Sequence, residues 1–161
     1  MKKIFDFIIL LIIWLALTWT VQIPDVIAGI VVAIVALLLF SDLFPVEITR
    51  LLNPVRFFWA LIYLPVFFWQ VIKSNIDVAY RVLHPEMPIR PGIVKVKTSL
   101  KSEVAKTFLA NSITLTPGTL TVDCIDQNLY VHWINIISEE PEEETKLIVE
   151  KFEKYLKKIF E

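Results

Sequence analysis

Residues 7–40, FIILLIIWLALTWTVQIPDVIAGIVVAIVALLLF, decide the fold class, and Asp25 is their only charged residue. As a helix, the first apolar run would extend about 27 Å at roughly 1.5 Å per residue, close to the roughly 30 Å of a bilayer hydrocarbon core. Only residues 22–25 separate it from a second apolar run. We therefore expect a tight hairpin of two membrane helices, at about residues 4–21 and 26–44.

The short connector marks where the second helix begins. Pro24 suits the first turn of a helix, where its missing N–H removes no helical hydrogen bond. Asp25 follows at the end of the helix dipole that favours negative charge. Lys2 and Lys3 would also suit a secretory signal, but no small-residue cleavage site follows the apolar run. We therefore expect the first run to stay in the protein as a membrane anchor.

The composition divides the chain into an apolar half and a polar half. Hydrophobic residues make up 56% of the 161 residues, and the mean hydropathy is +0.63, too high for an ordinary soluble domain. Residues 1–72 hold 8 charged residues and residues 73–161 hold 25. The net charge of −1 excludes a basic field for nucleic acid, and one cysteine and two histidines are too few for the usual metal sites. One membrane anchor joined to one small domain is the simplest interpretation.

A third apolar segment, at about residues 57–73, precedes the polar half. Its seven aromatic residues suit either a membrane interface or packing against other helices. Pro65 should kink it, and the helical spacing continues to residue 83, where His84-Pro85 should end the helix. The chain has three crossings if this segment spans the bilayer, and two if it lies in the interface or inside a larger complex. Lys and Arg are balanced between the two sides, so charge does not decide the orientation.

No predicted span has an ionisable residue at its centre. Intramembrane carboxylates, lysines and histidines are the usual mark of an ion path. The charged residues of this region all fall at or between the predicted helix ends: Asp6, Asp25, Asp42, Glu47, Arg50, Arg56 and Lys73. We therefore expect this chain to carry no ion path of its own, so that transport chemistry lies in partner subunits.

The polar half predicts a small α+β domain after a proline-rich linker at residues 84–92. Apolar periodicity predicts, in order, a strand over 93–98, a helix over 102–111, strands over 119–125 and 129–136 joined by a turn at 126–128, and a helix over 139–161. The order β-α-β-β-α places two helices on one face of a sheet. The predicted fold is a membrane protein with two or three transmembrane α-helices in residues 1–83, followed by an α+β domain in residues 93–161.

The domain offers few candidates for chemistry. The three glycines of the chain are not spaced to form a phosphate-binding loop. Cys124 could act as a nucleophile if His132 faced it across the hairpin, but nothing in the sequence orients the pair. We interpret both as strand residues and predict no catalytic residue, no cofactor site and no metal site.

One polar segment stands out between the predicted helix and the second strand. It consists of Asn111, Ser112, Ile113, Thr114, Leu115, Thr116, Pro117, Gly118 and Thr119. Pro117 pre-sets φ for a turn and Gly118 accepts the positive φ that a type II turn requires. The hydroxyl groups of this segment and of Thr121 can close local hydrogen bonds to the backbone. On these grounds the motif is structural.

The segment at residues 111–119, together with the helical hairpin before it, resembles the E-subunit family of multisubunit Mrp/Mnh-type cation/proton antiporters. The resemblance extends over nearly the whole chain. Related subunits resemble parts of archaeal membrane-bound hydrogenases and similar respiratory complexes. The resemblance implies an accessory subunit of a large complex in the cell membrane, with other membrane subunits as partners and the C-terminal domain in the cytoplasm. It supplies no catalytic residues and implies no nucleic-acid or small-molecule ligand.

Two hypotheses follow. The first is a structural subunit of a sodium/proton antiporter module, either free-standing or within a hydrogenase-type complex. A Lys/Glu-rich tail with scarce glycine and glutamine has some of the compositional features of hyperthermophile proteins, which favours the archaeal complex. The alternative is a stand-alone membrane-anchored adaptor whose soluble domain binds a separate partner protein.

Overall fold

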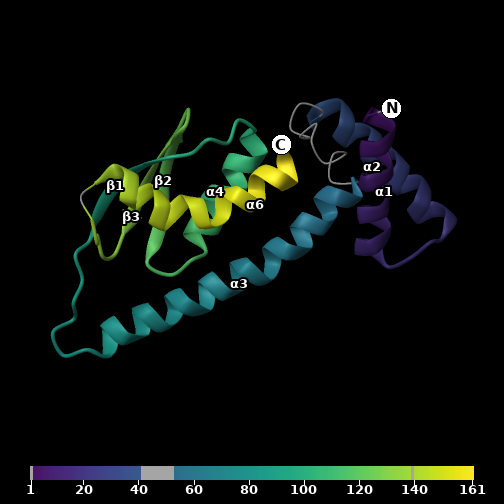
Figure 1. Ribbon diagram of the computed structural model, residues 1–161. Helices are drawn as coiled ribbons and strands as arrows, with labels where there is room; N and C mark the ends of the chain where they lie inside the picture. Colours follow the sequence, from purple (N-terminus) through teal and green to yellow (C-terminus); the bar gives the residue numbers. More distant parts are fainter. Residues whose placement is uncertain (1, 41–52, 139) are drawn as a thin grey trace. The chain divides into compact units, whose positions relative to one another are not determined.

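The structure, a computed structural model, describes residues 2–40, 53–138 and 140–161 (Figure 1). The chain folds into two compact units, Met1–Thr49 and Arg50–Glu161. The first unit contains helices α1 (Lys2–Thr18) and α2 (Ile23–Phe40). The second unit contains the long helix α3 (Pro54–Leu83) and the whole α+β domain.

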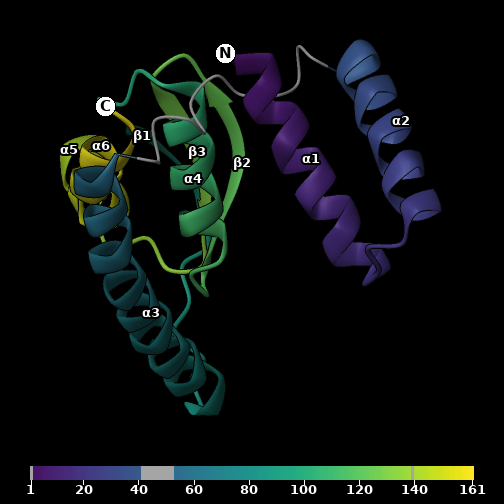
Figure 2. The same cartoon turned by 90° about the vertical axis from the view of Figure 1, so that its right-hand side faces the viewer.

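Helices α1 and α2 pack side by side as the predicted hairpin (Figure 2). The indole of Trp14 covers Gly29, where an added Cβ would come within 2.5 Å of the indole Cδ1. The same indole N–H donates a hydrogen bond to the backbone oxygen of Asp25 at 3.0 Å, and the Thr20 hydroxyl donates to the Asp25 carboxylate at 3.0 Å. Gly29 and Ala33 are the buried residues of α2. A large aromatic residue on one helix and small residues on the other therefore bring the two helices together.

The hairpin helices depart slightly from the predicted spans. Helix α1 ends at Thr18 rather than at residue 21, and Trp19 has a left-handed φ of 55°. Helix α2 begins at Ile23 rather than at residue 26, and its predicted end at residue 44 lies outside the described residues. By length and composition α2 and α3 can each cross a membrane, whereas the apolar part of α1, Ile4–Thr18, is shorter.

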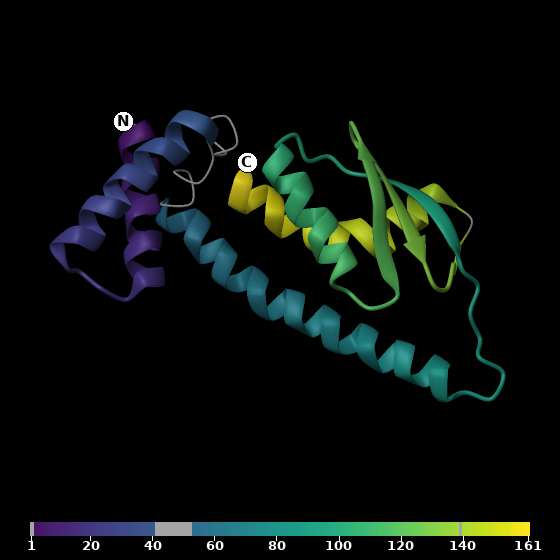
Figure 3. The ribbon, with the colours of Figure 1, turned by 180° about the vertical axis from the view of Figure 1, so that it is seen from behind.

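The α+β domain has the predicted β-α-β-β-α order. Its strands β1 (Gly92–Lys97), β2 (Thr119–Ile125) and β3 (Asn128–Trp133) form an antiparallel sheet in the order β1-β3-β2. Its helices are α4 (Glu103–Thr114), α5 (Pro141–Thr145) and α6 (Lys151–Phe160), with a π-helical turn, η3 (Lys146–Glu150), between the last two. Helices α4 and α6 lie on one face of the sheet (Figure 1 and Figure 3), as the sequence predicts.

The main core lies between the sheet and these helices. Alternate residues of β1 and β3 face it, because successive side chains of a strand point to opposite faces. The core consists of Val94, Val96, Leu100, Ala105, Leu109, Ile113, Leu129, Val131, Ile148, Val149, Phe152, Leu156, Ile159 and Phe160, together with Tyr63 of α3. Burial of a residue from α3 in this core ties that helix to the α+β domain.

Helix α3 belongs to the second unit, whereas the predicted membrane domain grouped it with the hairpin. Asn53 caps its start by accepting a hydrogen bond from the Val55 N–H at 3.0 Å, and the helix continues through Pro65. The rings of Tyr63 and Phe67 lie 6.5 and 6.3 Å from the ring of Phe152 in α6. Aromatic packing across this interface explains why α3 lies against α6 (Figure 3). Residues 84–91 then connect α3 to β1.

The two ends of α3 both contact the α+β domain. Near its start, the Arg56 guanidinium donates to the backbone oxygens of Ile159 and Glu161 at 3.1 Å each. Near its end, Val78 faces Gly118, so that a Cβ on the glycine would lie 3.4 Å from the Val78 Cγ2. The opposite side of the helix is apolar and exposed, and we call it the outer face of α3: Phe58, Leu61, Leu64, Phe68, Trp69, Ile72 and Ile76.

Candidate functional site at the Thr-Pro-Gly turn

The motif at residues 111–119 forms the end of α4 and the turn into β2. The Thr119 N–H donates to the Thr116 oxygen at 3.3 Å, and Gly118 has a φ of +90°. Proline and glycine therefore occupy the two central positions of the turn, as predicted from their conformational preferences. A Cβ at Gly118 would also lie 3.0 Å from the Ile134 Cγ2, so both the backbone conformation and the space favour glycine.

Hydroxyl groups of the motif make hydrogen bonds to the backbone of the motif and of the preceding turn of α4. Ser112 donates to the Phe108 oxygen at 2.6 Å, and Thr116 donates to the Ser112 oxygen at 2.7 Å. Thr119 donates to the Ile113 and Thr116 oxygens at 2.6 and 2.9 Å. The bonds to the Ser112 and Ile113 oxygens satisfy carbonyl groups in the last turn of α4, which have no partner four residues on within the helix.

The motif also joins β2 and α3. The Thr121 N–H donates to the Thr114 hydroxyl at 3.1 Å, and the Thr121 hydroxyl donates to the Ala110 oxygen at 3.1 Å. The hydroxyl groups of Ser112 and Tyr63 are hydrogen-bonded to each other. The motif therefore fixes three elements relative to one another: α4, the start of β2 and α3.

The remaining residues of the motif have different surroundings. Ile113 is buried in the core, whereas Asn111 and Leu115 are exposed. Pro117 lines a groove beside the turn.

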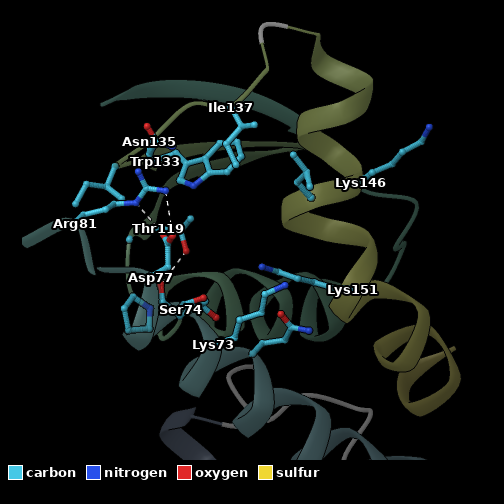
Figure 4. A pocket seen from close by; sticks show the side chains of 16 residues that line it. Lys73, Ser74, Asp77, Arg81, Thr119, Trp133, Asn135, Ile137, Lys146 and Lys151 are labelled. Carbon is cyan, nitrogen blue, oxygen red and sulfur yellow. Dashed lines mark hydrogen bonds and ion pairs between the residues drawn. The ribbon is translucent and has the colours of Figure 1, made fainter. Parts of the chain in front are cut away.

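That groove has a volume of about 410 Å³ and is shown in Figure 4. Helix α3 supplies Gln70, Lys73, Ser74, Asp77 and Arg81; the turn supplies Thr116, Pro117, Gly118 and Thr119; the segment from the end of β3 supplies Trp133, Ile134, Asn135 and Ile137; and the C-terminal helix supplies Lys146, Leu147 and Lys151. The α3 residues continue the side of the helix that buries Tyr63 and Phe67, because a spacing of three or four residues keeps side chains on one face.

A single carboxylate, Asp77, lines the groove among the described residues, and it is engaged by Arg81. The Arg81 Nε and Nη2 donate to the two Asp77 oxygens at 2.8 and 3.1 Å. Arg81 also donates to the Pro88 oxygen at 2.6 Å, and its guanidinium lies 3.2 Å from the side-chain amide of Asn135. This ion pair closes one end of the groove and ties the end of α3 to the segment after β3.

Lys73 and Lys151 reach toward one another across the groove (Figure 4). Burial of the Lys151 ammonium and its repulsion by Lys73 lower the pKa of Lys151 below its ordinary value. The Lys151 ammonium also lies 5.1 Å from the ring centroid of Phe152, but within the described residues neither ammonium group has a carboxylate within 4.0 Å. The groove therefore has an excess of positive charge on two facing side chains.

The sheet register separates Cys124 from His132. Cys124 pairs with Leu129 and His132 pairs with Leu120. Directly paired residues point to the same face of a sheet, so Cys124 shares the face of buried Leu129 and His132 points to the other face. Desolvation of the Cys124 sulfur raises the pKa of its thiol, which lowers the nucleophilic fraction. Among the described residues, the structure brings together no group of three or more His, Cys, Asp or Glu that could hold a metal ion.

A family model described as Na+/H+ ion antiporter subunit (MNHE) matches residues 7–159. The chain belongs to this family. The Na+/H+ antiporter E1 subunit of Staphylococcus haemolyticus is 31% identical over 95% of this chain and 94% of that protein. The Na+/H+ antiporter E subunit of Alkalihalophilus pseudofirmus is 46% identical in a match that covers 53% of this chain and 56% of that protein.

A solved structure resembles the full length of this member of the E-subunit family. It is a chain of the membrane-bound sulfane sulfur reductase, an archaeal respiratory membrane complex, with 40% identity and a TM-score of 0.79 over 99% of each chain. The resemblance to the E-subunit family stated from residues 111–119 is therefore confirmed, as is the class of an apolar helical region followed by a small sheet-and-helix domain.

The sequence alone did not single out the charged groove. Lys73 lies at the end of a predicted span and Lys151 in an amphipathic helix, positions where lysines are usually solvated. They meet only because α3 packs against the C-terminal helix. For Trp133, at the end of β3, the sequence likewise predicts only a place in a strand.

Proposed function

We propose that this chain is a non-catalytic accessory subunit of a multisubunit cation/proton antiporter module in the cell membrane. The observation that carries the proposal is the family match over residues 7–159. Relatives that match over nearly their full length are named antiporter subunits, and the full-length structural neighbour is part of a respiratory membrane complex. Other membrane subunits are therefore the partners we expect.

The chemistry of the hairpin supports an accessory role. Between Phe7 and Phe40 the sequence contains one ionisable residue, Asp25. Asp25 lies in the first turn of α2 and accepts a hydrogen bond from Thr20. A carboxylate at a helix start is placed for capping and for the helix dipole rather than for a proton path across the bilayer. We therefore assign ion translocation to other subunits.

We infer that the module is attached to a redox-driven complex of the hydrogenase type rather than free-standing. The chain is 40% identical to its structural neighbour from the sulfane sulfur reductase, and 31% and 32% identical to antiporter subunits of Staphylococcus haemolyticus and Bacillus subtilis. Greater identity over the full length favours the respiratory assembly.

We propose two membrane crossings, α1 and α2, with α3 lying along the membrane surface. Arg56 and Val78, near opposite ends of α3, both contact the α+β domain. They are separated by roughly 33 Å at about 1.5 Å per residue, which is comparable to the hydrocarbon thickness. A crossing α3 would draw helix α6, with its lysines, into the hydrocarbon, and buried ammonium groups there are costly. A surface position keeps α6 in water and places the outer face of α3 against lipid or partner subunits.

Gentle purification from the native membrane tests the accessory role. A tag at Glu161 should recover this chain with polytopic subunits and, for the hydrogenase-type assembly, with iron–sulfur subunits. Recovery of a stable monomer bound to one soluble protein would instead support a membrane-anchored adaptor. Sodium flux coupled to pH in liposomes that contain only this chain would contradict the proposal outright.

Topology is tested with single cysteines. Cys124 is exposed, so a membrane-impermeant maleimide should label it only from the cytoplasmic side of sealed vesicles if the α+β domain is cytoplasmic. In a Cys124→Ser background, spin labels at Leu61, Phe68 and Ile76 should report the same shallow depth. A maximum of depth at Phe68 would show that α3 crosses the bilayer.

A further inference from the structure

The groove beside the Thr-Pro-Gly turn contains more hydrogen-bond donors than the protein uses. The side chains of Gln70, Ser74 and Trp133 line it together with Lys73 and Lys151. None of these five side chains makes a hydrogen bond or an ion pair with another residue in the described part of the chain. Donors of an ammonium, a hydroxyl, an amide and an indole therefore converge on one space without a protein acceptor.

The positive charge in the groove favours the binding of an anion. Asp77 is the carboxylate of the described lining, and both of its oxygens are taken by Arg81. Lys73 and Lys151 face one another without such a partner (Figure 4). Lys151 is partly buried, whereas Lys73 is exposed. The two like charges repel each other, and an anion placed between them would relieve that repulsion and add charge-assisted hydrogen bonds.

We propose that this groove binds a phosphate-type oxyanion between Lys73 and Lys151. The donors come from three separate elements: α3, the end of β3 and the C-terminal helix. A tetrahedral phosphoryl group can accept from several directions at once, whereas a planar carboxylate offers two oxygens. Lysine is a common phosphate ligand because its ammonium acts as a compact point charge.

The phosphoryl group can come from a phospholipid headgroup or from a free phosphate. Trp69 and Ile72 of the outer face of α3 are exposed beside Lys73, so apolar surface and the cationic groove adjoin on one helix. With α3 at the membrane surface, that arrangement would hold acyl chains against the outer face and a headgroup near Lys73. The lipid source therefore rests on the proposed position of α3, whereas the oxyanion site itself does not.

The first experiment measures lipid retention. The full chain is placed in nanodiscs of phosphatidylcholine with a minor share of phosphatidylglycerol, and lipids that survive gentle delipidation are counted by native mass spectrometry. The wild type should retain phosphatidylglycerol in preference to phosphatidylcholine. The double variant Lys73→Gln/Lys151→Gln should lose that preference by about tenfold or more, since each lysine supplies a charge-assisted bond.

A matched control removes two charges elsewhere. Lys95 and Lys101 are exposed and lie outside the groove, so Lys95→Gln/Lys101→Gln should leave the retention within about twofold, as expected for surface charge alone. Equal losses in the two double variants would show general attraction to an anionic surface and would overturn the site.

The second experiment uses inorganic phosphate with the full chain in phosphatidylcholine nanodiscs. NMR of the lysine Cε carbons should show that phosphate raises the pKa of Lys151, because an anion favours the charged ammonium. An effect of phosphate without selective lipid retention would identify a free phosphate as the ligand, and lipid retention alone would identify the headgroup. If neither anion depends on Lys73 and Lys151, the proposal is wrong.

These measurements require no partner chain. If the wild-type chain co-purifies with its complex but binds neither anion, the site is overturned and the accessory role stands. Anion binding by a chain that fails to co-purify with other subunits would support the site and contradict the accessory role.

Discussion

Helices α2 and α3 are the two long apolar helices of the described part of the chain, and they have different neighbours. Both are long and apolar enough to cross a membrane. Helix α2 packs on α1 through Gly29 and leaves its other sides exposed and apolar. Helix α3 buries Tyr63 in the core of a charged domain. With α3 at the membrane surface, as we propose, hydropathy indicates only that a helix tolerates lipid, and its packing partners determine whether it crosses.

The largest expected effect comes from breaking the packing of α3 on α6. Phe152 is fully buried and contacts the rings of Tyr63 and Phe67. Phe152→Ala should lower the free energy of unfolding of the second unit by about 3–5 kcal/mol, because it removes buried contacts and leaves a cavity. Urea denaturation of the full chain in detergent, followed by hydrogen exchange of the α6 amides, measures the loss.

The matched control lies on the other side of α3. Ile76 is 65% exposed, so Ile76→Ala should change the same free energy by less than about 0.5 kcal/mol. Equal destabilisation by the two variants would show that α3 is not held by the face that carries Tyr63.

The second effect breaks the packing of α2. Gly29→Leu would drive a side chain into the indole of Trp14, which lies 2.5 Å from an ideal Cβ at that position. Overpacking of this kind should destabilise the hairpin by about 1–3 kcal/mol. In a Cys124→Ser background, spin labels at the exposed residues Ile12 and Val31 should move apart in pulsed distance measurements.

Two further variants test the steric explanation. Ala28 is the exposed neighbour of Gly29, so Ala28→Leu should leave the distance between the labels unchanged. Adding Trp14→Ala to Gly29→Leu should restore the distance, because it removes the clashing ring. An unaltered distance in Gly29→Leu itself would refute the contact.

The same contrast explains what the sequence could predict. The hairpin is local: residues 19–22 join its helices, and apolar runs specify both. The turn at Pro117-Gly118 is also local, since the two residues choose their own φ values. The place of α3 is not local, because the Ser112 partner of Tyr63 lies 49 positions away in the chain. The composition of α3 therefore does not predict that Tyr63 contacts Ser112.

The groove shows the same limit. Lys73 and Lys151 come from elements that the sequence assigns to different domains, so their approach follows from tertiary packing alone. The register that separates Cys124 from His132 contains an irregularity between Thr121 and Asp123, for which the alternation of residues gives no signal.

The third effect sharpens the comparison at the motif that receives α3. Thr116 is buried, and its hydroxyl donates to the Ser112 oxygen at 2.7 Å. Thr116→Val keeps the shape and leaves that carbonyl without a partner, which should cost about 1–2 kcal/mol. Thr107 makes an equivalent bond to the Glu103 oxygen at 2.9 Å on the exposed side of α4. Thr107→Val should cost less than about 0.5 kcal/mol, because water can replace the hydroxyl; equal costs would refute a special role for the motif.

The smallest effect concerns a buried ionisable residue in the unit that contains α3. By contrast, the buried residues of α2 are Gly29 and Ala33. Glu144 of α5 is 5% exposed, and desolvation raises the pKa of its carboxyl. The folded state therefore binds its proton more tightly than the unfolded state, and the stability from this group is complete below the ordinary glutamate pKa and lost as pH rises through the raised one. Glu144→Gln should match the wild type in acid and become slightly more stable as pH rises to neutrality, as measured by urea denaturation over the pH range in which carboxylates titrate.

The control is Glu143, which is exposed in the same first turn. Glu143→Gln loses the same favourable interaction with the helix dipole without relieving burial. A pH-dependent gain in the free energy of unfolding in Glu144→Gln alone would therefore isolate the cost of desolvation. Parallel curves of that free energy against pH for the two variants would contradict this explanation.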